Sequence, residues 1–145
     1  TKHWRMLAGN GGKNCFKNGG FYLFQGGAKN GPTIHWAIGN GRTEGMQVHT
    51  GYGSIAPRQW HHIVGRYSRG QPEVFLDGSN VSRFAWGIYR GRIANSVEPF
   101  RVGHLGPENT DYRKMGWFHG RMDEVILYNR ALSDAEIQLL HQAQR

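Results

Sequence analysis

The chain has little cysteine, a shortage of acidic residues and no long apolar run. Only one of its 145 residues is a cysteine, which excludes an internal disulfide and a zinc site made of cysteines alone. No run of about 18 apolar residues is present, so we expect no membrane-spanning helix. The chain does not open on an apolar signal peptide, and we therefore expect either a cytosolic protein or a mature or excised fragment.

The shortage of acidic residues makes the chain strongly basic. Its 18 Lys and Arg against 10 Asp and Glu give a formal net charge of +8. A field of that sign favours an anionic partner, whether an acidic polysaccharide, a nucleic acid or an anionic surface, and does not choose among them. Arginines scattered over solvated faces are the alternative interpretation. Nucleic-acid binding has only the net charge in its favour, and we do not expect it.

Glycine and aromatic residues are abundant instead. The chain contains 22 glycines, and 12% of its residues are aromatic. Many short strands joined by glycine turns would give this composition, whereas only the carboxyl-terminal residues have helical spacing. At this length the chain fits one domain over residues 1–145. We therefore predict an all-β, antiparallel sandwich or barrel with a short carboxyl-terminal helix.

Within the carboxyl-terminal residues 120–142, the spacing of the apolar residues changes halfway from that of a strand to that of a helix. Residues 122–128 (Met-Asp-Glu-Val-Ile-Leu-Tyr) are mostly apolar or aromatic, with β-branched residues among them, which predicts a buried strand. Ser133 followed by Glu136 is a capping box, the signature of a helix start. We predict a helix of one to two turns from this point. Its apolar side would be formed by Ile137, Leu139 and Leu140.

Earlier strands are predicted from short apolar runs between turn residues. Asn40-Gly41 is the strongest short hairpin signal in the chain, and Asp77-Gly78 predicts a second tight turn. The predicted strands are residues 20–25, 33–38, 45–50, 60–67, 72–76 and 81–85, and residues 1–7 form the end of another.

Two histidines on these strands could share a sheet face. His35 and His49 each alternate with apolar neighbours. They would form either a metal pair or plain polar positions of a sheet. We favour the polar interpretation because no carboxylate accompanies them in the sequence.

Several segments together resemble a known family. They read Trp-His-His-Ile-Val at 60–64, Val-Phe-Leu-Asp-Gly at 74–78, Phe-Arg-Val-Gly at 100–103, and Gly-Arg-Met-Asp-Glu-Val at 120–125 followed by Tyr-Asn-Arg-Ala-Leu-Ser at 128–133. In order and spacing they resemble the laminin-G-like, concanavalin-A-like jelly-roll modules that are common in secreted bacterial proteins. The resemblance runs from about residue 19 to 142. It implies an antiparallel jelly roll and an extracellular or cell-surface location.

The resemblance also implies that part of the module is missing and that some aromatic residues are structural. Such modules usually begin with several strands before the point that matches Trp4. The chain would then be an amino-terminally truncated fragment, a cleaved product, or a chain that receives strands from a second chain. Trp60, Tyr67 and Phe75 belong to the shared motifs, and we assign them to packing.

The same fold family includes glycoside hydrolases and polysaccharide lyases, so an enzyme must be considered. Glycosidases need two carboxylates on either side of the scissile bond. Asp123 and Glu124 are adjacent and would point to opposite faces of a strand, while Glu73 and Asp77 flank a turn. We therefore expect no enzyme, and a polysaccharide-degrading activity is the lower alternative.

A binding role fits two long loops, residues 84–96 and 106–118, better. Aromatic faces stack on pyranose rings, and a guanidinium can make two parallel bonds to a carboxylate or sulfate. The alternative is that Trp86 and Trp117 plug the core. The candidate ligand-binding residues are Trp86, Tyr89, Arg90, Arg92, Tyr112, Arg113 and Trp117.

Calcium is a common structural ion in the modules that this chain resembles. Asp123 stands where some relatives place a ligand, and Asp111 lies in a loop that could supply another. Calcium takes roughly six to eight oxygen ligands, and those expected from amino-terminal strands are not in this sequence. We expect no other cofactor.

These observations predict a non-catalytic carbohydrate-binding module for an acidic or sulfated polysaccharide, accessory to a secreted enzyme or surface protein. The alternative is a protein-interaction or adhesion module of the laminin-G type. That alternative predicts an exposed apolar patch in place of a polar groove.

Overall fold

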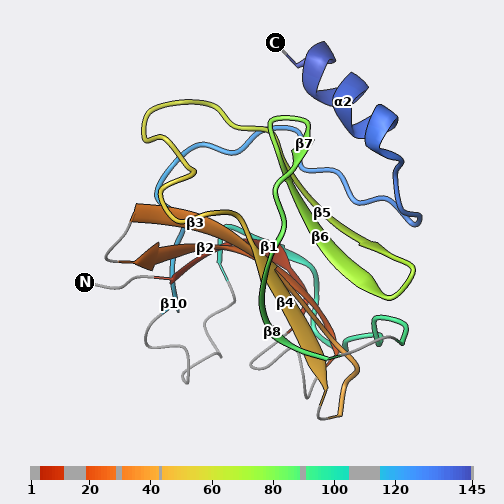
Figure 1. Cartoon of the computed structure of the whole chain (residues 1–145). Coiled ribbons are helices and arrows are strands. Elements are labelled where there is room, and N and C mark those ends of the chain that lie inside the picture. The colour runs from red at the N-terminus through yellow and green to blue at the C-terminus, as the bar shows by residue number, and fades with distance from the viewer. Residues whose placement is uncertain are drawn as a thin grey trace.

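The computed structural model of the chain has two packed β-sheets with a helix beside them (Figure 1). It describes residues 4–11, 19–28, 31–42, 44–88, 91–104 and 115–144. Neighbouring strands run antiparallel in this part of the chain except where β10 runs parallel to β1. The predicted antiparallel sandwich with a carboxyl-terminal helix is confirmed.

The larger sheet has seven strands within the described residues. Their order is β10-β1-β2-β3-β4-β8, and β9 pairs with β1 on the same side as β10. The strands predicted around residues 20–25, 33–38, 45–50 and 81–85 are confirmed with small shifts of their ends. The bounds are β1 (Trp4–Gly9), β2 (Gly20–Ala28), β3 (Gly31–Gly39), β4 (Gly45–His49), β8 (Arg83–Gly87), β9 (Arg101–Val102) and β10 (Met115–Gly116).

The smaller sheet is a hairpin with a short third strand. It consists of β5 (Ile63–Ser68), β6 (Gln71–Leu76) and β7 (Ser79–Asn80). Asp77 and Gly78 have φ values of 50° and 80°. Two successive left-handed residues are what a type I′ hairpin turn requires, so this predicted tight turn is confirmed.

Two predictions for this sheet are wrong, namely that its first strand begins at residue 60 and that Trp60 packs in the core. The strand begins at Ile63, and Trp60 is 67% exposed instead of packed in the core. The reason lies in the Asp77 carboxylate, which accepts hydrogen bonds of 2.9 Å from the His61 ring and from the His62 backbone N–H. These bonds tie residues 61–62 to the β6–β7 turn, and Trp60 is left outside the sheet.

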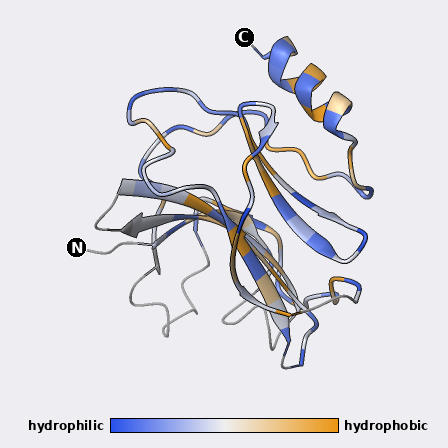
Figure 2. Ribbon diagram, viewed as in Figure 1, coloured by the Kyte–Doolittle hydropathy of each residue, from blue (hydrophilic) through white to orange (hydrophobic). Residues whose placement is uncertain are grey.

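The main core lies between the two sheets, and Trp36 connects them. The Trp36 indole N–H donates to the Arg66 carbonyl at 3.1 Å, which joins β3 to β5. The ring passes over Gly65, where an added Cβ would lie 2.6 Å from two Trp36 ring atoms. Apolar and polar residues alternate along the strands (Figure 2). The inward apolar residues include Leu7, Ile34, Trp36, Ile38, Val48 and Val74.

The other face of the larger sheet carries a second buried cluster and the two histidines. His35 and His49 are register partners whose rings lie 5.4 Å apart, so they share a face as predicted. The His35 ring also stacks on Phe24 at 5.0 Å. The Gln47 amide donates to His35 Nδ1 at 2.8 Å, which puts the proton of the neutral ring on Nε2. These contacts give His35 a structural role in the cluster.

The carboxyl-terminal helix is confirmed and is longer than predicted. Helix α2 (Asp134–Ala143) has ten residues. The Glu136 N–H donates to Ser133 Oγ at 3.2 Å, and the Ser133 N–H donates to the Glu136 carboxylate at 2.7 Å, which is the predicted capping box. Ile137 is fully buried against Phe75. Leu139 is 64% exposed, because a residue two positions from Ile137 points about 200° away around the helix.

The predicted buried strand over residues 122–128 is wrong. These residues belong to no strand, and Leu127 is 64% exposed. Glu124 has a left-handed φ of 49°, and its N–H is held by the Asp123 carboxylate at 2.9 Å. This turn interrupts the extended conformation in the middle of the apolar run. Apolar composition alone therefore did not produce a strand here.

The contact between Trp36 and Gly65 generates a stability prediction. We expect Gly65→Ala to lower the free energy of unfolding by about 1 to 3 kcal/mol, because the new methyl group overlaps the buried indole. Gly116→Ala is the matched control, since a Cβ there meets only the Trp4 carbonyl oxygen at 3.9 Å. Urea unfolding measures both. Equal stability of the two variants would contradict the proposed role of Gly65.

The buried His35 ring generates a pH prediction. Burial and the neighbouring His49 lower the pKa of His35 from 6.5 to about 4. Between these two values the unfolded chain binds more protons than the folded one, so the free energy of unfolding falls as the pH falls. At about 1.4 kcal/mol per pH unit, the full loss is about 3 kcal/mol. In His35→Asn the decrease in stability between pH 7 and about pH 4.5 should be correspondingly smaller, and an unchanged decrease would contradict this assignment.

Candidate functional site

The two tryptophans predicted to bind ligand lie at opposite edges of the larger sheet. Trp86 is in β8 at one edge, and Trp117 follows β10 at the other. Five strand spacings separate these edges, which corresponds to about 24 Å. Trp86 is 43% exposed and Trp117 is 65% exposed, so neither plugs the core. They do not line one common groove.

At the β8 edge, Trp86 shares a face of the sheet with Arg83. Trp86 is the register partner of Gln47, and Arg83 is the partner of His49. Residues two apart on a strand point to the same face, so Gln47 and His49 bring their partners to one side. The register shifts between these pairs, and this bulge allows Arg83 and Trp86 to share the face although they are three residues apart.

Tyr52 completes a group of exposed side chains at this edge. Its ring lies 5.3 Å from that of His49 and is 54% exposed. The Arg83 guanidinium lies over Gly51, because a Cβ added at Gly51 would be 3.3 Å from the guanidinium carbon. Tyr52 and Arg83 thus line one surface pocket of about 500 Å³ between residues 51–54 and 80–83. We call it the Tyr52–Arg83 pocket.

One wall of the Tyr52–Arg83 pocket is fixed by hydroxyl groups. The Thr33 hydroxyl donates to the Thr50 carbonyl at 2.9 Å, and the Thr50 hydroxyl lies 2.6 Å from that of Ser54. The Gly53 N–H donates to the Pro32 carbonyl at 3.0 Å. The turn that carries Tyr52 is therefore anchored to the start of β3.

The opposite wall is fixed by Asn80 and Ser82. The Ser82 hydroxyl donates to the Asn80 side-chain oxygen at 2.6 Å and accepts from the Val74 N–H at 2.8 Å. The Asn80 amide donates to Glu73 at 2.9 Å. Among the described residues, none that lines the pocket is acidic and none forms an ion pair with the Arg83 guanidinium. The pocket therefore has hydrogen-bonded walls and carries the positive charge of Arg83.

Trp117 and Arg92 have different surroundings. The Trp117 ring stacks on His104 at 4.4 Å, and its carbonyl accepts from Arg5 at 3.3 Å. Arg92 lies in the segment of residues 91–96 that lines the space between the two sheets. Arg92 therefore lies neither with Trp86 at the β8 edge nor with Trp117 at the β10 edge. Four other predicted ligand-binding residues lie outside the described residues, namely Tyr89, Arg90, Tyr112 and Arg113.

Of the two residues proposed for calcium, the structure describes Asp123 alone. Asp123 is exposed, and its carboxylate accepts from the neighbouring Glu124 N–H. Asp111 lies outside the described residues. No group of three or more His, Cys, Asp or Glu side chains able to hold a metal occurs among the residues that the structure describes. Calcium binding by Asp123 and Asp111 therefore stays a prediction.

A histidine–aspartate pair stands near the smaller sheet. His61 Nδ1 lies 2.9 Å from the Asp77 carboxylate. Burial alone would raise the pKa of Asp77, but the hydrogen bonds from His61 and from the His62 N–H lower it. The His61 Nε2 accepts from the Ala56 N–H at 3.1 Å. Because both ring nitrogens have partners, the pair holds the turn in place and presents no free base.

Most other described carboxylates are likewise bound to cations. Arg66 binds Glu73 at 2.8 Å and Asp134 at 2.7 Å. Arg130 binds Glu136 at 2.6 Å. These pairs give the carboxylates structural roles in the smaller sheet and at the start of α2.

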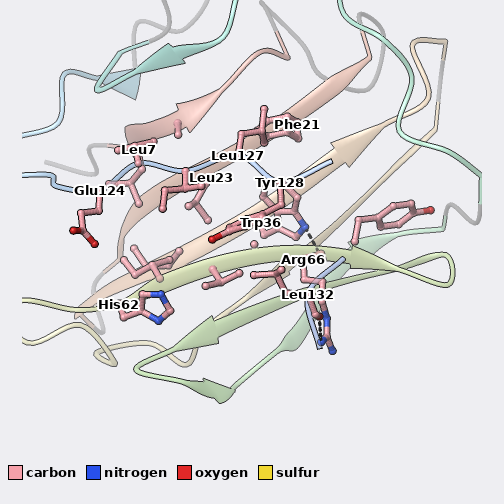
Figure 3. Close-up of a pocket in the computed structure, with 18 of the residues that line it drawn as sticks. Leu7, Phe21, Leu23, Trp36, His62, Arg66, Glu124, Leu127, Tyr128 and Leu132 are labelled. Carbon is pink, nitrogen blue, oxygen red and sulfur yellow. Dashed lines mark hydrogen bonds between the residues drawn. The ribbon is translucent and has the colours of Figure 1, made fainter. Parts of the chain in front are cut away.

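A large cleft opens between the two sheets (Figure 3). Its walls include Leu23 and Trp36 from the larger sheet, and residues 121–132 line it as well. Leu127 and Tyr128 from that segment are 64% and 42% exposed. The β5 strand is at the end of its sheet in the described structure, so one of its edges is unpaired. The cleft is mainly apolar, in contrast to the Tyr52–Arg83 pocket.

Sequence reasoning found Trp86 and missed Tyr52 and Arg83. The two residues stand 31 positions apart and meet only because β4 pairs with β8. The one local signal was the Gly-Tyr-Gly triplet at 51–53 directly after a strand. An aromatic residue between two glycines in a turn is well placed to be exposed.

The comparisons with known proteins place the chain in a family. It matches the model of the concanavalin A-like lectin/glucanases superfamily over residues 2–138. The chain therefore belongs to this superfamily, as the sequence motifs predicted. A search of curated proteins finds no match.

Among solved structures, one that is similar is an S-layer domain-containing protein from Clostridium thermocellum, represented by its residues 221–444. The two are 16% identical with a TM-score of 0.45, and the match covers 86% of this chain and 57% of that one. The chain thus spans little more than half the length of that structure. In the described part of the chain, no helix combines the length and the apolar character needed to cross a membrane.

Proposed function

We propose that this chain is a non-catalytic carbohydrate-binding module that binds an acidic or sulfated polysaccharide. The observation that carries the proposal is the exposed Trp86 on the same sheet face as Arg83, which forms no ion pair with any described residue. An aromatic face stacks on a sugar ring, and a guanidinium binds an anionic group. Membership in a superfamily of lectins and glucanases supports a glycan ligand.

The module would act outside the cell or at its surface, as an accessory to a secreted enzyme or a surface protein. A non-catalytic role is supported by the carboxylates that are bound to arginines or to backbone N–H groups. A glycosidase instead needs two carboxylates across its scissile bond. The net charge of +8 would draw the module toward an anionic polymer.

A second candidate function, self-association as an adhesion module, is favoured by the apolar cleft. Residues 122–128 have the composition of a strand yet remain exposed, and β5 has an unpaired edge in the described structure. The occupant that fits this edge is the same segment of a second copy, added as a strand. Exchange between two copies would bury Val125 and Leu127, which are 47% and 64% exposed.

The lead proposal is tested by affinity electrophoresis against neutral, uronic-acid and sulfated polysaccharides at low and moderate salt. We expect an acidic polysaccharide to retard the chain at both salt concentrations, and Trp86→Ala to abolish the retardation. Trp60→Ala is the control, because Trp60 is also exposed, at 67% against 43% for Trp86, but precedes the first strand of the smaller sheet. Trp117→Ala tests the opposite edge of the larger sheet.

Two outcomes would contradict the lead proposal. One is no retardation by any polysaccharide, with circular dichroism showing that the chain is folded. The other is equal retardation by every polyanion that disappears with salt, since counterion release explains attraction of that kind.

The second candidate function predicts a concentration-dependent dimer in sedimentation experiments. Leu127→Lys should leave the chain monomeric, because a charge would be buried between the two copies. Leu139→Lys is the control, since Leu139 is equally exposed but lies on α2. A wild-type chain that stays monomeric at high concentration would rule this function out.

A further inference from the structure

We propose that the Tyr52–Arg83 pocket is the subsite that binds the carboxylate of a uronic acid residue in the polysaccharide. This inference rests on the proposed carbohydrate-binding function and adds the location and the chemical group recognised. Neither Tyr52 nor Arg83 was among the residues that the sequence singled out for ligand binding.

The first observation is the unbalanced charge of Arg83. Its guanidinium forms no ion pair with any described residue, and none of the described residues that line the pocket is acidic. Arg66 and Arg130 differ from Arg83, since each binds a carboxylate of this chain. Arg83 therefore keeps its donors available for an anion from outside, and its planar fork suits two parallel bonds to a carboxylate.

The second observation is that the Arg83 guanidinium lies close to the backbone of Gly51. The guanidinium lies over Gly51, where an added side chain would start only 3.3 Å from the guanidinium carbon. Glycine at this position lets the cation lie flat against the turn. The Thr50–Ser54 and Asn80–Ser82 hydrogen bonds fix the two walls. A guanidinium that is held in advance loses less side-chain entropy on binding.

The third observation is the aromatic surface beside the cation. The Tyr52 ring is 54% exposed, and one side of it packs against His49 at 5.3 Å. A pyranose ring that presents its carboxylate to Arg83 could then rest on Tyr52. The pocket combines an apolar platform and a single cation, which matches a ring that carries one carboxylate.

The position of Trp86 extends the subsite along β8. The partners of Arg83 and Trp86 on β4 are two residues apart, so the two side chains are about 7 Å apart along the strand. Trp86 can therefore stack on a neighbouring sugar of the same polymer. A polysaccharide would run along the exposed edge of the sheet, with its charged group at Arg83.

The test uses the whole chain with polygalacturonate, alginate and hyaluronan, each beside its carboxyl-reduced neutral form. We expect at least one of the uronate polymers to bind, and its reduced form to bind far more weakly. Arg83→Gln should weaken binding about tenfold or more, since a hydrogen-bonded charge is lost. The affinity of Arg83→Lys should lie between those of the wild-type chain and Arg83→Gln, because lysine keeps the charge but cannot make two parallel bonds to the carboxylate. Tyr52→Ala should also weaken binding.

Two controls match these changes. Arg42→Gln removes the same charge from an exposed arginine in the β3–β4 hairpin, and Tyr128→Ala removes an exposed ring from the cleft segment. Both should change the affinity less than about twofold, as expected for surface positions outside the site. Circular dichroism and thermal unfolding of every variant show whether the fold is retained.

The outcomes separate this inference from the function on which it rests. If the wild-type chain binds none of these polymers and no sulfated polysaccharide, the proposed function itself fails. If it binds a sulfated polysaccharide alone, the function stands and the uronate assignment is overturned. If a uronate polymer binds, but Arg83→Gln weakens binding no more than Arg42→Gln does, the function stands and the pocket assignment is overturned. Equal binding of a polymer and its carboxyl-reduced form would overturn the assignment as well.

Discussion

The rest of the structure depends on the contact between the Trp36 indole and the backbone of β5. The ring fits between the sheets only because position 65 has no side chain, and its N–H bonds the Arg66 carbonyl. The Arg66 side chain then binds Glu73, Asp134 and the Leu132 carbonyl. One pair of neighbouring residues on β5 thus links the larger sheet, the smaller sheet and the start of α2. A defect at this point would loosen all three together.

The contact at Trp36 also accounts for the cleft between the two sheets, which differs in character from the β8 edge. The described part of the smaller sheet has three strands against seven in the larger one, so Trp36 closes only part of the space between them. The remainder is the apolar cleft, whose lining segment keeps side chains such as Leu127 exposed. The β8 edge is different, because hydrogen-bonded hydroxyl and amide groups hold its walls. Recognition of a polar ligand requires this kind of fixed wall, whereas the cleft suits another apolar surface.

The features that were predicted correctly from the sequence are those whose signal is local. The Asp77-Gly78 turn and the Ser133–Glu136 capping box depend on residues next to one another, and both are present. Residues 122–128 were predicted wrongly because a strand also needs a partner edge and an unbroken extended backbone, which the left-handed Glu124 interrupts. Prediction of the candidate site has the same limit, because it also depends on residues that are far apart in the sequence. Trp86 could be found from the aromatic and arginine residues around it in the sequence, but Tyr52 and Arg83 are brought together by strand pairing across some thirty residues of chain.

The charge of the chain acquires a specific meaning only through its local surroundings. A net charge of +8 attracts any polyanion and selects none. Arg66 and Arg130 use their charge within the fold, so they add to the distant field without offering donors to a ligand. Arg83 differs because it lies over a glycine, beside an exposed ring, and has no carboxylate partner among the described residues. If the module distinguishes one acidic polysaccharide from another, the discrimination must come from such a position, since the long-range field is the same for all of them.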